Sequence, residues 1–457
     1  MLNYIWLALI LLSVAIGGWT DRLKGVTDGA FDGARTAVTI ALGLIGVMAL
    51  WLGVMRLAER AGLVQRLARG LRPVMTRLFP GVPNDHPAMG SMLMNMAANM
   101  LGLGNAATPL GLRAMRDLEK LNPHPGTATN AMCTFLALNT SSVQLIPTTA
   151  IAMLVAAGSS NPTVIVGTSL LATLCAATVA ITTVKLLEKL PWFRVRTAQP
   201  VAGVGDPGYV ESIKDQPDDR SSKDTAAAGV TDPGYKGAAL RPWGRALLAL
   251  VAFFFLALFV RQVFPEALGW PSGPIPPSPN YFVRCVSALS ILAIPMLLTF
   301  FTLYAALCGL KVYDEFVEGA KEGFGVILKI IPFLVTMLVA INMFKGAGGI
   351  DLLARALSPI LTPLHFPTDL LPIALMRPLS GGATLALFTD VVHRLGPENI
   401  VSLMAATIYG STETTFYVVA VYFGSVGVKQ TRHAIPAGLL ADFAGVAASV
   451  LICRAVL

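Results

Sequence analysis

The sequence predicts an all-α polytopic membrane protein made of two inverted-topology repeats, each with an interfacial helix, a re-entrant hairpin and a broken span. Of its 457 residues, 54% are hydrophobic and 13% are charged, whereas soluble proteins carry about 25% charged residues. Apolar runs of about 20 residues, the length that crosses a bilayer, recur along the chain. Two stretches, ARGLRPVMTRL from Ala68 and ARALSPILTPL from Ala354, match at a shift of 286 residues.

The repeat extends beyond these two stretches. The same shift carries Gly33 onto Gly319, and a shift of 272 residues pairs NTSSV from Asn139 with STETT from Ser411. A two-fold repeat with interrupted hydrophobic segments is the usual build of secondary transporters. The second and seventh spans are an aligned pair and lie five steps apart, so the two copies are expected to run in opposite directions.

Nine segments have the length and apolarity of full membrane spans. They cover residues 3–19, 36–55, 127–155, 164–187, 243–262, 281–308, 323–342, 399–424 and 435–454. The first lacks the basic start and the small-residue cleavage site of a signal peptide, so it is interpreted as an uncleaved span. We therefore expect a multi-pass protein of the inner (cytoplasmic) membrane.

The chain is predicted to divide into two membrane repeats, 1–192 and 241–457, joined by residues 193–240. This connecting stretch is rich in Pro, Gly, Asp, Ser and Lys, which predicts a disordered cytoplasmic linker. GDPGY from Gly205 and TDPGY from Thr231 are either a short docking motif or part of a turn-rich linker. Two complete modules on one linker indicate a fusion of two ancestral subunits.

An arginine-rich stretch at 56–77 follows the second span. Its apolar positions keep helical spacing, which is typical of a helix lying in the membrane interface. These positions are Leu63, Leu67, Leu71, Val74 and Leu78. The second copy, at 347–364, keeps the apolar stripe but only one arginine, Arg355. Unequal charge on equivalent helices is expected if they face opposite sides of the membrane.

Each half then contains an apolar segment that is interrupted by small and polar residues, at 88–112 and 370–392. The first reads NMAANMLGLGNAATP from Asn95, and the second contains RPLSGGAT from Arg377. Irregular backbone at membrane depth is tolerated only where it is buried in protein or lines a cavity. These segments are therefore predicted to be re-entrant hairpins.

Polar residues in the hairpins and in the third and eighth spans form the predicted substrate- or ion-binding set. They are Asn95, Asn99, Asn105, Asn139, Thr140, Ser141, Ser142 and Gln144 in the first half, and Arg377, Ser380, Gly381, Gly382, Ser411, Thr412, Glu413, Thr414 and Thr415 in the second. In an inverted repeat these elements converge near the midplane, where freed carbonyls, hydroxyls and amides bind ions or polar solutes. The alternative is that they only link helices, at about 0.6–2 kcal/mol each.

Two charges stand out in this set. Glu413 and Arg377 both lie at predicted membrane depth, where a lone charge costs at least about 2.5–3.5 kcal/mol. They are expected to pair, either as a static structural pair or as a working site. In the working site, Glu413 would bind a coupling cation (Na⁺ or H⁺) and Arg377 an anionic group of the solute. Asp390 is a further candidate that would lie at a hairpin end.

Enzyme functions are not predicted. The sequence has no HExxH, P-loop, dinucleotide fingerprint or nucleophile elbow in a suitable context. The five cysteines lie singly in apolar segments, and the five histidines are scattered near predicted membrane boundaries. No catalytic residue, metal site or cofactor is therefore expected. The net charge of +8 is explained by basic loops retained on the cytoplasmic side rather than by nucleic-acid binding.

The two halves resemble the spore maturation proteins of types A and B. The first half carries NMAANMLGLGNAATP, GLRAMRDLEKLNP and TNAMCTFLALNTSSVQLIPT; the second carries IPFLVTMLVAINMFKGAGG, LMRPLSGGAT and YGSTETTFYVVAVYFG. The resemblance places the chain in the nucleoside-recognition, or Gate-domain, group, which looks related to concentrative nucleoside transporters. It implies a membrane protein that handles a solute, but it does not imply which one.

The leading functional prediction is a secondary transporter or channel-like permease for a small polar or anionic solute, with nucleosides among the candidates. The alternatives are a non-transporting scaffold or regulator that acts through the linker, and a lipid-handling protein. Arginine-rich interfacial helices would suit anionic lipid headgroups in the last case. The expected partners are the solute or ion and the lipid bilayer, and a homo-oligomer is left open.

Overall fold

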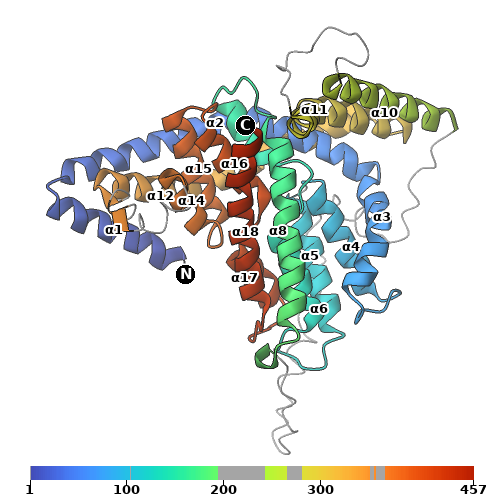
Figure 1. Ribbon diagram of the computed structural model, residues 1–457, viewed down its shortest axis with the longest axis horizontal. Coiled ribbons are helices and arrows are strands. Elements are labelled where there is room, and N and C mark those ends of the chain that lie inside the picture. Colours follow the sequence, from blue (N-terminus) through green and yellow to red (C-terminus); the bar gives the residue numbers. More distant parts are fainter. Residues whose placement is uncertain are drawn as a thin grey trace, which may run out of the picture.

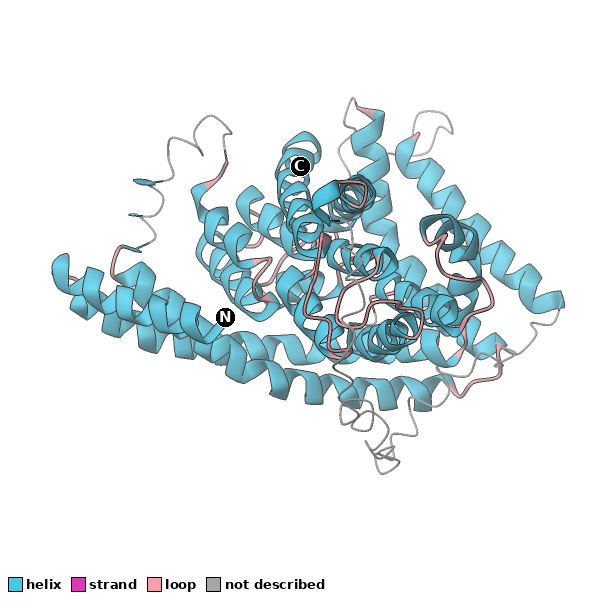
Figure 2. Ribbon diagram, turned by 90° about the horizontal axis from the view of Figure 1, so that it is seen from below, coloured by secondary structure: helices cyan, strands magenta, loops and turns pink. Residues whose placement is uncertain are grey.

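The computed structural model describes residues 2–102, 104–193, 242–264, 280–349, 352, 355–356 and 366–457. Within these ranges the secondary structure is helical apart from one isolated bridge between Thr127 and Gln430. Figure 1 shows long helices crossing one another, and Figure 2 shows helices joined by short loops. The predicted all-α fold class is confirmed.

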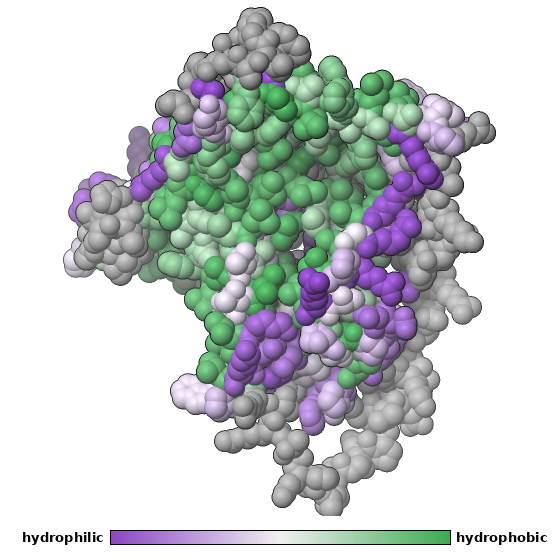
Figure 3. All heavy atoms as spheres, turned by 45° about the vertical axis from the view of Figure 1, so that its right-hand side comes forward, coloured by the Kyte–Doolittle hydropathy of each residue, from purple (hydrophilic) through white to green (hydrophobic). Residues whose placement is uncertain are grey.

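Most predicted spans correspond to single helices. These are α1 (Leu2–Trp19), α2 (Leu23–Arg60), α8 (Ile165–Leu187), α10 (Pro242–Val263), α11 (Tyr281–Leu307), α12 (Val312–Gly346) and α18 (Ala434–Val456). Five of them (α2, α8, α10, α11 and α18) are long and apolar enough to cross a membrane. In Figure 3, apolar side chains cover most of the visible face and polar ones gather at its lower end and along one edge. The chain is a multi-pass membrane protein.

The helices α2 and α12 form a long antiparallel pair. Gly25 of α2 lies against Gly346 near the end of α12, and Gly53 near the end of α2 lies against Phe316 near the start of α12. A Cβ atom on Gly33 would lie 2.6 Å from the carbonyl oxygen of Leu338. Glycines at i, i+4 and i+8 allow two helices to approach this closely. Both helices therefore extend well beyond the predicted spans 36–55 and 323–342.

The contacts of this pair obey the sequence repeat. Gly33 of α2 contacts Leu338 of α12. Moving 286 residues forward from Gly33 gives Gly319, and moving 286 residues back from Leu338 gives Leu52; these two residues are also in contact. A Cβ atom on Gly319 would lie 2.6 Å from the carbonyl oxygen of Leu52, the same distance as in the first contact. The repeat shift exchanges the two helices and gives the same contact again. A two-fold axis between equivalent helices has this effect.

A bundle of helices that includes α8 and α18 crosses α2 and α12 at a steep angle (Figure 1). It contains α8 and α18 together with the third and eighth predicted spans, each of which is broken into two helices. The third becomes α6 (Asn130–Ser141) and α7 (Thr148–Ala156), and the eighth becomes α16 (Ile400–Ser411) and α17 (Thr415–Gly424). Both breaks fall within the polar segments that the sequence predicted.

The two broken spans run in opposite directions. The amide of Ala128, before α6, donates to the carbonyl of Gln430, after α17, at 2.9 Å. At the other end, the amide of Ser160, after α7, donates to the carboxylate of Glu398, before α16, at 2.7 Å. The linker begins at the first of these ends, because Arg432 donates to the carbonyl of Phe193. We call the two ends of the bundle the linker end and the Glu398 end.

Each predicted hairpin is a pair of helices whose tip touches a break. The first consists of α4 (Pro87–Met100) and α5 (Gly104–Glu119), and the carbonyl of Met100 accepts from the amide of Leu145 at 3.0 Å. The second consists of α14 (Leu371–Met376), preceded by the 3₁₀ turn η3 (Thr368–Leu370), and α15 (Gly381–Leu395). Here the carbonyl of Pro378 accepts from the amide of Phe416 at 2.9 Å.

The interfacial helix differs from its prediction. It is α3 (Leu63–Leu78), separated from α2 by a turn in which Gly62 has a φ of 76°, and Arg56 belongs to α2. Arg56 forms ion pairs with Glu315 at 3.0 Å and Glu322 at 2.6 Å on α12. The prediction that Arg56 belongs to the interfacial helix was therefore wrong.

The predicted apolar stripe of α3 is also shifted around the helix. Val64, Ala68 and Met75 are the buried residues, whereas Val74 is 53% exposed. The predicted leucines Leu63, Leu67, Leu71 and Leu78 are partly buried beside them. The reason is that α3 packs against α4 instead of lying alone in the interface, so the residues facing its neighbours in the protein are the buried ones.

Two sequence predictions fall outside the described residues. The second interfacial helix at 347–364 and the linker at 193–240 lie almost entirely outside these ranges. The helices α10 and α11 form an adjoining pair at one edge of the molecule (Figure 1).

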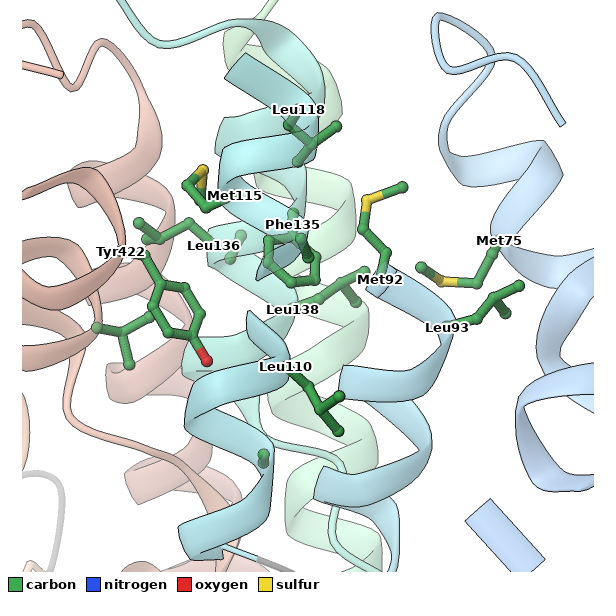
Figure 4. Close-up of a cluster of buried hydrophobic side chains, with 14 of the residues drawn as sticks. Met75, Met92, Leu93, Leu110, Met115, Leu118, Phe135, Leu136, Leu138 and Tyr422 are labelled. Atoms are coloured by element: carbon green, nitrogen blue, oxygen red, sulfur yellow. The ribbon is translucent and has the colours of Figure 1, made fainter. Parts of the chain in front are cut away.

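The largest core lies where the first hairpin meets both broken spans. Figure 4 shows Met92, Phe135 and Tyr422 converging from α4, α6 and α17, which come from both halves of the chain. The rings of Phe135 and Tyr422 stack with centroids 6.0 Å apart. The two sequence halves are therefore interleaved in space.

Candidate functional site

The four interrupted elements meet at one cavity of about 230 Å³. The first hairpin contributes Gly102, the first break Gln144, the second hairpin Arg377 and Gly381, and the second break Glu413. The long helix α2 closes one side. The predicted convergence of hairpins and breaks is therefore present in the geometry, although only four residues of the predicted set line the cavity.

Local sequence explains both breaks. The helix α6 ends because Ser142 adopts a left-handed φ of 36°, and Pro147, which has no N–H, starts the next helix. In the second break Thr412 is extended, with a φ of −141°. The carbonyl of Thr140 is freed by the first break and accepts from the amide of Glu413 at 2.7 Å. Each break thus satisfies backbone groups that the other exposes.

The side chain of Glu413 is half-buried and faces an amide. Gln144 Nε2 lies 3.3 Å from Glu413 Oε1 and 3.3 Å from Ser142 Oγ, and donates to both. This contact connects the first break to the second through their side chains. A carboxylate and an amide at membrane depth can accept from and donate to a polar solute.

The guanidinium of Arg377 is only 2% exposed and is held by the eighth span. Its Nε donates to Thr412 Oγ1 at 3.3 Å and its terminal nitrogen donates to the carbonyl of Tyr409 at 2.9 Å. It also lies 4.9 Å from the centre of the Tyr409 ring. Among the described residues Arg377 and Glu413 form no direct ion pair, so the predicted pairing was wrong. Backbone carbonyls and an aromatic face stabilise the cation instead.

The opposite wall of the cavity was not predicted from the sequence. Trp51 and Met48 of α2, with Thr148 and Thr149 of α7, lie in this wall. Trp51 Nε1 is buried and has no hydrogen-bond partner among the residues that the structure describes. A buried indole N–H without a partner is uncommon and is available to a bound acceptor. Its position in an ordinary apolar span gave no signal in the sequence.

Three asparagines of the predicted set, Asn95, Asn99 and Asn139, join one hydrogen-bond network with Tyr422. Asn99 Nδ2 donates to Asn139 Oδ1 at 2.9 Å, and the Tyr422 hydroxyl donates to the same oxygen at 3.3 Å. Asn95 donates to the carbonyl of Ala107 at 2.8 Å and to the Tyr422 hydroxyl at 3.4 Å. This network joins the first hairpin to both broken spans beside the core of Figure 4. The side chain of Asn105 lies outside the description.

Most predicted hydroxyl groups bond within the protein. Ser380 caps α15, Thr140 donates to the carbonyl of Leu136, Ser141 to that of Leu138, and Ser411 contacts Ser449. Thr414 is buried against Gly381, Gly382 follows in the first turn of α15, and Thr415 donates to Asp442. Asp390 pairs with Lys345 at 3.5 Å and Arg394 at 3.4 Å, away from the cavity.

Comparisons with known proteins show what this chain is similar to. The Gate family model, described as nucleoside recognition, matches residues 41–158 and 327–429. Spore maturation protein A of Bacillus subtilis is 48% identical over 174 residues, which are 38% of this chain and 89% of that protein. Spore maturation protein B of the same organism is 41% identical over 170 residues, 37% of this chain and 96% of that protein. The chain belongs to the family of spore maturation proteins A and B.

The residues matched by the Gate model include both breaks and both hairpins, and hence the cavity lining of this family member. Among solved structures, the YdaH transporter of Alcanivorax borkumensis is similar with a TM-score of 0.40 and 15% identity. That alignment covers 99% of this chain and 96% of the transporter.

Proposed function

We propose that the chain is a secondary transporter or channel-like permease of the inner membrane for a small polar or anionic solute. The observation that carries the proposal is the cavity where both hairpins and both breaks meet, lined by Arg377, Glu413 and Gln144. Transporter sites form where discontinuous helices meet between repeats. Charged side chains at membrane depth are costly and are typical of such sites.

The lining favours a particular kind of solute. Arg377 and the N–H of Trp51 are donors for an anionic or carbonyl group, and Glu413 is an acceptor for a hydroxyl or amine. The cavity of about 230 Å³ is smaller than the roughly 300–1,000 Å³ of pockets for drug-sized ligands. A compact solute is therefore favoured. The description of the family as nucleoside recognition supports nucleosides as candidates.

Two other functions account for less of the structure. A scaffold that acts through its linker has no need of charged groups in a cavity at membrane depth. A lipid-handling protein would use α3, whose arginines suit anionic headgroups, but α3 does not line the cavity. The transporter proposal uses both features, with α3 anchoring the first hairpin at the interface.

The proposal is tested by ligand-induced stabilisation of the purified protein. Fractions of a bacterial metabolite extract are added, and the melting temperature is recorded for the wild type, Thr149→Trp and Leu186→Trp. Thr149→Trp fills the cavity, whereas Leu186→Trp adds the same side chain at an exposed position on α8. We expect a fraction that stabilises the wild type and Leu186→Trp but not Thr149→Trp. Equal stabilisation of all three proteins would place binding outside the cavity.

A further inference from the structure

A second buried carboxylate lies behind the second break. Asp442 is in the middle of α18 and is 1% exposed. Its Oδ2 accepts from Thr415 Oγ1 at 2.6 Å, and its Oδ1 has no hydrogen-bond partner in the described part of the chain. A charged carboxylate with an unsatisfied oxygen is one of the most costly groups that a membrane protein can bury. The mechanism proposed above does not use it.

The helix α18 packs closely against both broken spans around Asp442. Gly438, one turn before Asp442, lies against Thr415 and Thr140, and Gly445, one turn after it, lies against Thr412 and Ala176. Glycines at these two positions let both breaks approach the helix without intervening side chains. Any movement of the second break therefore changes the surroundings of the carboxylate directly.

The charges near the breaks do not balance. The charged groups acting on Asp442 from neighbouring elements are Arg377 and Glu413. From α6 and α8, the residues nearest the flanking glycines of α18 are the uncharged Thr140 and Ala176. With both carboxylates ionised, this buried region carries one cation and two anions. One added proton restores neutrality, which is strongly favoured at low dielectric.

We infer that Asp442 binds and releases a proton as the second break moves, and so couples a proton to the solute of the cavity. The coupling rests on the proposed transport function, whereas the proton site does not depend on it. A proton fits better than Na⁺ because, among the described residues, Thr415 supplies the one oxygen partner of the carboxylate. A metal ion needs several oxygen ligands, whereas a proton needs a single oxygen atom.

The proton site is tested by infrared difference spectroscopy of protein labelled with ¹³C at the aspartate carboxyl groups. The wild-type spectrum at acidic pH minus the one at alkaline pH should contain a carboxyl band from a protonated, buried aspartate. The band should be lost in Asp442→Asn and kept in Glu413→Gln, because the label separates aspartate from glutamate. A wild-type spectrum without the band, or an unchanged band in Asp442→Asn, would overturn the inference.

Asp442→Asn is itself at risk of misfolding, so Thr415→Val provides a second measurement. It keeps the carboxyl group and removes its one hydrogen-bond donor, so the band should shift in frequency. An unshifted band in folded Thr415→Val would also overturn the assignment, because a carboxyl bonded to Thr415 must respond.

Coupling is tested separately in proteoliposomes that are incubated with a metabolite extract under a pH gradient. The gradient should increase accumulation of a metabolite by the wild type, and Asp442→Asn should lose this increase. If both proteins accumulate the metabolite equally with and without the gradient, the coupling is overturned and transport still stands. An aspartate band that titrates in a protein that moves no metabolite would leave the proton site standing and contradict transport.

Discussion

Glu413 and Arg377 are held in different ways, and this predicts different consequences of replacing them. Arg377 is fixed by Thr412 and the carbonyl of Tyr409, whereas Glu413 contacts only the amide of Gln144 through its side chain. Because Gln at position 413 keeps a hydrogen bond to Gln144, Glu413→Gln should change the unfolding free energy by less than about 1 kcal/mol. It should nevertheless abolish stabilisation by the active metabolite fraction.

A thermal melt of Glu413→Gln with and without that fraction checks both statements. A large loss of stability that Arg377→Gln reverses would instead identify a structural charge pair. Undiminished ligand stabilisation would remove Glu413 from the binding site.

His433 predicts a pH dependence at the linker end, outside the spans. It is 0% exposed, its ring lies edge-on to Phe193, and within the described ranges neither ring nitrogen has a hydrogen-bond partner. Burial, with the positive charges of Arg432 and Lys185, lowers the pKa of His433 to about 4. The unfolded chain, with a pKa of about 6.5, binds the proton more readily. Stability is therefore complete above pH 6.5 or so and declines as the pH falls toward 4.

The decline should amount to at most about 3 kcal/mol. Melting temperatures measured across this pH range should fall more steeply for the wild type than for His433→Phe, which cannot be protonated. His393→Gln, on the surface, serves as the control. Parallel curves for the wild type and His433→Phe would show that another group causes the acid sensitivity.

At the scale of elements, the α2–α12 pair depends on glycine. A Cβ atom at Gly33 or Gly319 would lie 2.6 Å from a backbone oxygen of the other helix, whereas nothing lies within 4 Å of one at Gly46 of α2. Gly33→Ala and Gly319→Ala should each destabilise the protein by about 1–3 kcal/mol. Gly46→Ala should be neutral or stabilising by up to about 1 kcal/mol, because alanine favours helix.

Melting temperatures of the three variants in one detergent test this account of the pair. Because Gly33 and Gly319 occupy equivalent places in the repeat, their effects should be similar. If Gly33→Ala and Gly46→Ala have equal effects, the two helices do not approach each other as closely as described.

The breaks and hairpins could be predicted from the sequence because their cause is local. Pro147 has no N–H and lies between α6 and α7, and polar residues occupy both breaks. The length of α2 was missed because residues 23–35 are too polar for a span, although Gly25, Gly29 and Gly33 were a readable packing signal.

Other features depend on tertiary contacts that no local pattern records. The partner of Arg377 and the buried face of α3 follow from which helices lie beside them. Trp51 joins the cavity only because α2 crosses the breaks. Asp442 is different, since a lone carboxylate in the last span was visible in the sequence and qualified as an intramembrane charge.

At the scale of the whole molecule, the two hairpins are predicted to enter the membrane from opposite sides. The first has its base at the linker end, where Val82 and Leu118 lie near Arg432. The second has its base at the Glu398 end, where Arg394 pairs with Asp369 at 2.8 Å. Single cysteines at the exposed positions Asp85 and His393, in a cysteine-free background, should therefore react with an impermeant reagent from opposite faces. Labelling from the same face would contradict an inverted arrangement in the membrane.

The central claim is that a solute crosses the membrane through the cavity between the breaks. The most direct measurement is mass spectrometry of metabolites taken up from an extract by proteoliposomes containing the wild type, Thr149→Trp or no protein. We predict that at least one small polar or anionic metabolite enters with the wild type and not with Thr149→Trp or empty vesicles. Equal uptake by the wild type and Thr149→Trp, or no uptake by a folded wild type, would contradict it.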